Sequence, residues 1–87
     1  MIISDEKLEE IRLRCEAATP GPWTSHIEGR DHSSGTSFIM TGCGGDRGND
    51  IELSGSTDAD QDFIAHARQD IPILLAEVKR LRALLSL

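Results

Sequence analysis

Two side chains of this sequence have the chemistry to hold a small anion that carries an aromatic ring. Arg68 bears a fixed positive charge on a planar guanidinium, whose N–H groups match phosphate or carboxylate oxygens. Trp23 is the chain's one tryptophan, and its indole offers a ring face for stacking. The alternative interpretation is that Arg68 pairs with a nearby carboxylate, Asp62 or Asp70, or is merely exposed. The binding interpretation requires positions 23 and 68 to meet in the fold.

A glycine-rich segment, residues 42–48, is the second feature with possible chemistry. It is not a phosphate-binding P-loop, because neither a Gly-Lys-Ser/Thr ending nor a helix follows it. Two interpretations stay open: a flexible hairpin loop, or a lid whose backbone N–H groups approach a ligand. With the lid included, the predicted ligand-binding residues are Trp23, Phe63, Arg68, Gly44, Gly45 and Arg47.

The acidic run at residues 58–62 resembles the start of a calcium loop but fails its pattern. The sixth and twelfth positions of such a loop are glycine and glutamate, whereas here they are Phe63 and Gln69. Other metal-binding or nucleophilic residues show no known ligand spacing and no nucleophile–base motif. These residues are His26, His32, Cys43 and Asp46. We therefore predict a non-enzyme without metal or cofactor.

The charge of the chain argues against general nucleic-acid binding. Of the net charge of −6, residues 1–70 carry −8 and residues 71–87 carry +2. A phosphate backbone attracts basic surfaces, so an acidic body disfavours it but does not exclude one nucleotide in a local pocket. The N-terminus shows no basic region followed by a long apolar run, so we expect a cytoplasmic protein without a membrane segment.

The elements that must position these residues can be read from the pattern of the chain. Ser4 is a candidate N-cap for a helix that ends near Ala18, because two prolines follow within four residues. Strands are predicted at 23–28, 36–41 and 50–54, with Ile51 and Leu53 alternating against acidic residues in the third. Three strands with one apolar face need a helix to cover them.

The C-terminal third reads as a kinked pair of helices. Thr57 and Asp60 form a capping box for the first, and Asp70, a candidate N-cap, with Pro72 predicts a break or kink before a last helix at about residues 71–86. The predicted fold class is therefore α+β, in a single domain that spans residues 1–87. It comprises a helix and proline corner (1–22), a three-stranded antiparallel sheet (23–54) and C-terminal helices (57–87).

The last helix carries the strongest pattern, a short heptad seam. Its a and d positions are Ile71, Leu74, Val78, Leu81 and Leu85. β-Branched residues at a with leucine at d favour parallel two-stranded packing, in which Glu77 would face Arg82 of a second chain. The alternative is that the stripe covers the chain's own sheet. Because Leu75 and Leu84 widen the apolar face, we predict a homo-oligomer formed through this helix.

Three segments together resemble a group of small phage and prophage proteins described as Ead-like. They are Ala17–Trp23, Asp62–Arg68 and Asp70–Val78; residues 24–57 match nothing familiar. The family carries no assigned activity, so the resemblance implies only a phage-encoded accessory protein in a bacterial cytoplasm. By analogy with small phage proteins that counter host defences, the ligand would be a nucleotide-derived immune signal that is held without cleavage.

Two rival functions stay open at this stage. An acidic surface that mimics nucleic acid could inhibit a basic host protein, and that binding would weaken steeply with salt. A zinc or thiol enzyme would contain bound metal or a reactive Cys43. Binding that survives Trp23→Ala and Arg68→Ala would favour the inhibitor, and elemental analysis with a thiol titration would test for the enzyme.

Overall fold

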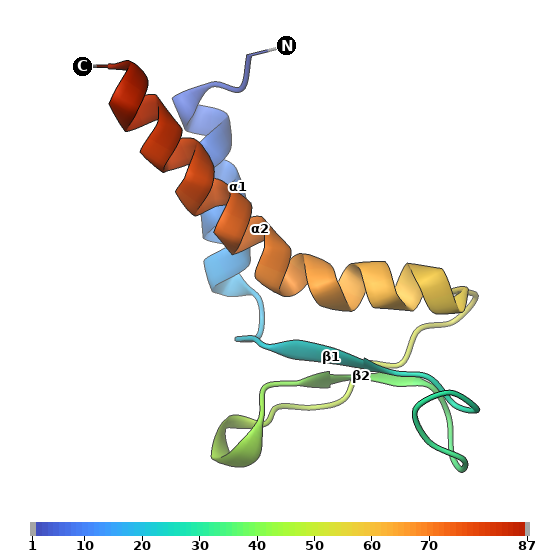
Figure 1. Ribbon diagram of the computed structural model, residues 1–87. Helices are drawn as coiled ribbons and strands as arrows, with labels where there is room; N and C mark the ends of the chain where they lie inside the picture. The colour runs from blue at the N-terminus through green and yellow to red at the C-terminus, as the bar shows by residue number, and fades with distance from the viewer. Residues whose placement is uncertain (1, 87) are drawn as a thin grey trace.

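The computed structural model describes residues 2–86 and has the predicted α+β class. Its elements, in chain order, are α1 (Asp5–Ala17), β1 (Trp23–His26), β2 (Phe38–Thr41), one 3-10 turn η1 (Gly44–Asp46) and α2 (Asp58–Leu85). The first half of α2 lies over the two-stranded sheet, while its second half projects beyond the sheet beside α1 (Figure 1). We call residues 19–70 the body, and residues 5–18 with 71–85 the arm.

Helix α1 forms where the sequence predicts it. The Ser4 hydroxyl accepts a hydrogen bond from the N–H of Lys7 at 3.0 Å, which satisfies one of the free N–H groups of the first turn. The helix ends at Ala17, and Ala18 donates to the Arg14 carbonyl. Its half-buried residues recur at helical spacing along the side that meets α2: Leu8, Ile11, Arg12, Cys15 and Ala18.

The sheet has two strands, so the prediction of a third is wrong. β1 and β2 pair antiparallel from Trp23–Thr41 to His26–Phe38. Of the segment 50–54, only Ile51 joins them, through one antiparallel bridge to Ile39 with N···O distances of 2.8 and 2.9 Å. Two apolar residues are too few to hold a full strand against the sheet. On one side of the bridge a side-chain hydrogen bond joins Thr36 to Glu52 at 3.1 Å, and on the other side the Thr41 hydroxyl donates to the Asn49 carbonyl at 2.8 Å.

Helix α2 is one continuous helix, so the predicted break into two is also wrong. The capping box of Thr57 and Asp60 is present as expected. Pro72 lies inside the helix and cannot donate a hydrogen bond to the carbonyl of Arg68. Losing one bond bends the helix rather than ending it, and the change of direction is visible where α2 leaves the sheet (Figure 1). Asp70 is therefore an interior residue and not a cap.

The core of the body is small and partly polar. Its buried apolar residues are Ile27, Ile39 and Ala65, and Thr41 and Gln61 are buried with them. The Gln61 side-chain amide lies 3.0 Å from the Phe38 carbonyl and 3.2 Å from the His26 carbonyl. Hydrogen bonds therefore supplement apolar packing in holding α2 to the sheet. Among residues 2–86, no helix is long and apolar enough to cross a membrane.

Candidate ligand site at the proline corner

The fold brings Trp23 and Arg68 together around one backbone carbonyl. The Thr19 oxygen accepts a hydrogen bond from the indole Nε1 of Trp23 at 3.1 Å and another from Nε of Arg68 at 2.9 Å. Trp23 opens β1 directly after the proline corner, and Arg68 lies on α2 just before its bend. Two residues that are 45 positions apart in the sequence are thus fixed to the same atom.

A second polar contact holds this part of the helix to the strand. The side chain of Gln69 accepts from the Trp23 N–H at 2.8 Å and donates to the Trp23 carbonyl at 3.0 Å. The amide thereby pairs with the strand's backbone much as a neighbouring strand would. A Cβ on Gly21 would lie 3.4 Å from both Arg68 Cγ and Gln69 Oε1, so the corner itself is packed closely against α2.

The positive charge of Arg68 has no carboxylate partner. Among residues 2–86, every other arginine has a carboxylate oxygen within 4.0 Å, and Arg68 has none. Asp62 is committed to Arg30, at 2.8 and 3.0 Å in a two-point pair. The alternative in which Arg68 pairs with Asp62 or Asp70 is therefore wrong. Its Nη1 and Nη2 atoms make no hydrogen bond within the described chain, which leaves both for an anion.

The N–H group of the Trp23 indole is already engaged within the chain. The indole Nε1–H is already used on the Thr19 carbonyl, and the side chain is half-buried. A ligand at the corner would meet the indole through its π-face, by stacking, and would meet Arg68 through charge and N–H donors. The two side chains supply different interactions from adjacent positions.

The glycine-rich loop lies beside the corner and is folded. Gly42 donates to the Pro22 carbonyl at 2.8 Å, and Gly48 donates to the Thr41 carbonyl at 2.9 Å. A Cβ on Gly48 would lie 3.3 Å from Thr19 Cγ2, so the end of the loop touches the corner. Between these anchors, open space surrounds Gly44 and Gly45.

Arg47 and Phe63, the other two predicted ligand residues, are placed less favourably. Arg47 is paired with Asp50 at 2.8 Å on the same loop. Phe63 lies five residues before Arg68 on α2, which places it about 140° around the helix. Its side chain is 75% exposed and lines a separate shallow cavity with Leu53 and Ile64. The corner therefore contains Trp23 and Arg68, flanked by the loop, without Phe63.

Some functional atoms of the corner carry no sequence signal. The Thr19 carbonyl is a backbone group, and any residue type at that position would supply it. Gln69 follows Gln61 and Ala65 at intervals of four, so all three lie on the helix face that meets the sheet. From the sequence, two glutamines on one face of a helix suggest that this face is in water. In this helix, Gln61 and Gln69 instead lie on the face that packs against the sheet.

The predicted seam residues lie in the arm and are largely uncovered. Ile71, Leu74, Leu81 and Leu85 are exposed and Val78 is half-buried. α1, and not the sheet, meets this half of α2, which corrects the alternative in which the stripe covers the sheet. Arg82 pairs with Asp5 at 2.6 Å and also contacts the Ile3 carbonyl, while Glu77 pairs with Arg80. Both charges of the expected interchain pair are thus used within one chain.

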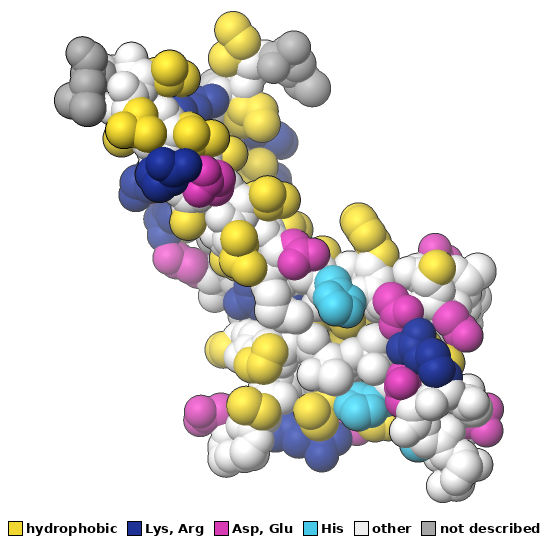
Figure 2. Space-filling view, viewed as in Figure 1, with side chains coloured by type: hydrophobic (Ala, Val, Ile, Leu, Met, Phe, Trp, Pro, Cys, Tyr) yellow, Lys and Arg dark blue, Asp and Glu magenta, His cyan; other side chains and the backbone are white. Residues whose placement is uncertain are grey.

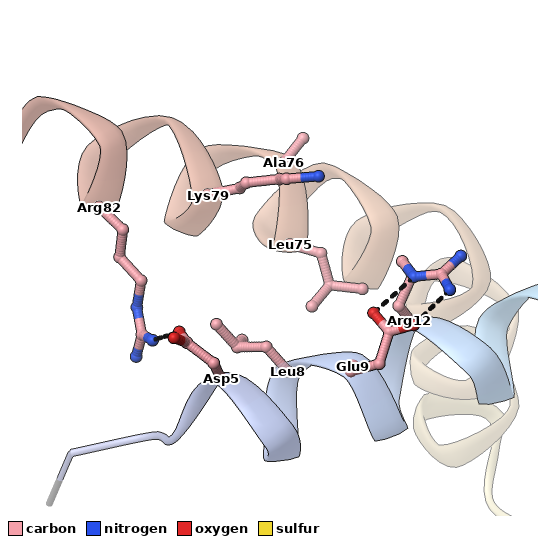
Figure 3. A pocket seen from close by; sticks show the side chains of 8 residues that line it. All are labelled: Asp5, Leu8, Glu9, Arg12, Leu75, Ala76, Lys79 and Arg82. Atoms are coloured by element: carbon pink, nitrogen blue, oxygen red, sulfur yellow. Dashed lines mark hydrogen bonds and ion pairs between the residues drawn. The ribbon is translucent and has the colours of Figure 1, made fainter.

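Between the two helices of the arm lies a cavity of about 420 Å³. Leu8 and Leu75 face one another across it, and the ion pairs Asp5–Arg82 and Glu9–Arg12 flank it (Figure 3). The space between the helices of the arm is therefore lined by apolar side chains in the middle and by charged side chains at its rim. No family model, curated protein or solved structure matches this chain.

Proposed function

We propose that this protein is a non-enzymatic binding protein that holds a small anionic ligand at the proline corner. The observation that carries the proposal is the free charge of Arg68: it is the one arginine of residues 2–86 without a carboxylate, and it is fixed beside Trp23. On a chain with a net charge of −6, a fixed cation with two free N–H-bearing nitrogens is a local site for an anion.

The chemistry of the corner selects a class of ligand. A ligand that satisfies both side chains needs an anionic group for Arg68 and a flat ring for Trp23, and a nucleotide has both. The loop would cover the ligand with its backbone at Gly44 and Gly45, around which there is open space. The resemblance to phage accessory proteins adds a context in which the ligand is a nucleotide-derived signal of a host defence, sequestered rather than cleaved.

The single tryptophan makes the test direct. We expect ADP-ribose, or a cyclic dinucleotide, to quench or shift the fluorescence of Trp23 and to release measurable heat in calorimetry, while inorganic phosphate binds more weakly because it lacks the ring. Arg68→Gln keeps a donor for the Thr19 carbonyl but removes the charge. It should weaken binding at least about tenfold, the usual effect of one lost charge-assisted bond.

Arg14→Gln is the matched control, because it removes an exposed arginine of α1 that lies in the arm and not at the corner. Its affinity should equal that of the unaltered chain. Equal binding by Arg68→Gln, or no response to any anion of the panel, would contradict the proposal. Binding to a basic protein that survives Arg68→Gln and weakens steeply with salt would instead support the acidic inhibitor.

A further inference from the structure

The arm exposes more apolar surface than one chain of this size usually leaves in water. Five side chains of α2 form what we call the outer face: Ile73, Leu74, Leu81, Leu84 and Leu85. Four of them are more than half exposed, at 65% for Ile73, 62% for Leu74, 55% for Leu84 and 87% for Leu85. In Figure 2, apolar side chains gather along the arm, whereas the body carries a mixture of types. We propose that a second copy of this chain docks on the outer face.

The dimensions of the molecule support a docked copy. Its radius of gyration is 16.0 Å, whereas a compact domain of 87 residues has about 12 Å. Its accessible surface is 6476 Å², about 1,400 Å² more than the roughly 5,000 Å² expected for a folded chain of 9.5 kDa. A stable dimer buries about 800 Å² on each partner. For the whole chain, the surplus surface exceeds the area that one partner of such a dimer buries.

The position of α1 decides which side of α2 receives the second copy. α1 contacts the side of α2 that carries Leu75, Lys79 and Arg82 (Figure 3). The outer face lies largely on the far side of the same helix, because at about 100° per residue its centre is about 140° around α2 from those residues. Two arms that meet through this face pack α2 against α2, with each α1 on the outside of the pair.

The charges of the outer face fit a copy of the same surface in antiparallel orientation. Glu77 and Arg80 lie within the apolar residues, at 50% and 58% side-chain exposure. Within one chain Glu77 and Arg80 pair with each other. A two-fold axis between positions 78 and 79 sets this ion pair opposite its own copy, with Glu77 facing Arg80 of the second copy and Ile73 facing Leu84 of the second copy. A surface that is complementary to itself in this way commits to a second copy rather than to a different partner. The parallel pairing of Glu77 with Arg82 is disfavoured, because Arg82 holds α1.

Sedimentation velocity over a range of concentrations tests the interface, and it does not depend on the proposed ligand. We expect a particle of twice the 9.5 kDa chain mass. Leu74→Gln combined with Leu81→Gln should weaken the dimer about 100-fold, because two apolar side chains lose their burial. Since both residues are exposed in the single chain, its circular dichroism should not change. Phe63→Gln, an equally exposed apolar residue of the body, is the control and should leave the dimer intact.

Charge reversal tests the antiparallel register. Glu77→Arg alone and Arg80→Glu alone place like charges across the two-fold axis and should each weaken association, while an equimolar mixture of the two variants should recover it. A 9.5 kDa particle at all concentrations would overturn the proposal. So would a dimer that survives the double glutamine variant, or a mixture that associates no better than its components.

Discussion

The body and the arm of this protein are held together in opposite ways. In the body, backbone carbonyls and side-chain amides meet one another, so that Gln61 and Gln69 tie α2 to both strands by hydrogen bonds. In the arm, two helices touch along one strip and leave leucines such as Leu84 and Leu85 in water. Directional bonds fix one geometry, whereas apolar contact accepts any matching surface. Under the two proposals, the body would hold the ligand site in shape and the arm would bind a second copy.

The largest expected effect comes from the apolar centre of the body. Ile39 is fully buried, and its backbone bridges both β1 and the segment at Ile51. Ile39→Ala should lower the free energy of unfolding by about 3 kcal/mol, the usual cost of a cavity of this size. Leu81→Ala in the arm removes a similar side chain that is 45% exposed, so the same urea titration should show well under half that loss at low protein concentration. Equal losses would abolish the distinction between the regions.

The glycine loop offers a second test of how rigidly the body is built. Gly42 has φ +72° and no room for a Cβ, which would lie 2.4 Å from the Asp46 carbonyl. Gly42→Ala should therefore cost about 2 kcal/mol or more, from both the left-handed backbone and the clash. Gly44 has φ +57° with open space around it, so Gly44→Ala isolates the backbone cost at about 1 kcal/mol. Thermal unfolding of the two variants separates the contributions, and equal midpoints would mean that the loop yields to the clash.

Sequence reasoning predicted the local features of this fold better than the contacts between distant segments. The helix starts at Ser4 and Thr57 were predictable, because a cap is a short-range hydrogen bond between residues three apart. The third strand was over-predicted because alternation over five residues does not show whether the neighbouring chain continues to pair. The continuous α2 was missed because a proline inside a helix either bends it or ends it, and packing against the sheet decides which.

The candidate site was predictable to the level of residue types but not of contacts. Trp23 and Arg68 stand out in the sequence as a ring and a charge on an acidic chain. Their meeting at the Thr19 carbonyl depends on how the proline corner folds against α2, and no pattern encodes a backbone acceptor. Phe63 was grouped with them because it is near in sequence, whereas helical geometry turns it to another side.

A smaller effect is expected at the polar contacts that hold α2 on the sheet. Gln61 is 2% exposed, and Gln61→Leu removes the buried donor that the carbonyls of His26 and Phe38 accept from. The substitution should lower the free energy of unfolding by about 1–2 kcal/mol. Gln69 is only half-buried, and water can replace part of its contact with Trp23. Gln69→Leu should therefore cost less, by the same chemical denaturation assay. A larger loss at Gln69 would mean that the corner, and not the centre of the sheet, anchors the helix.

The smallest expected effect is a pH dependence at the edge of the body. Two-point hydrogen bonding to Arg30, and then a hydrogen bond from Ser25, lower the pKa of Asp62 from 3.8 to about 2. Because the folded-state pKa lies below the unfolded value, the ionised carboxylate stabilises the fold above about pH 4, and this contribution is lost as the pH falls from 4 to 2. The pair is solvent-exposed, so the effect on the melting temperature should be small.

Arg30→Gln should remove part of the decline in melting temperature between pH 4 and pH 2, and Lys7→Gln, an exposed cation of the arm, should leave it unchanged. An identical decline in both variants would show that the Arg30–Asp62 pair adds nothing to the stability of the body.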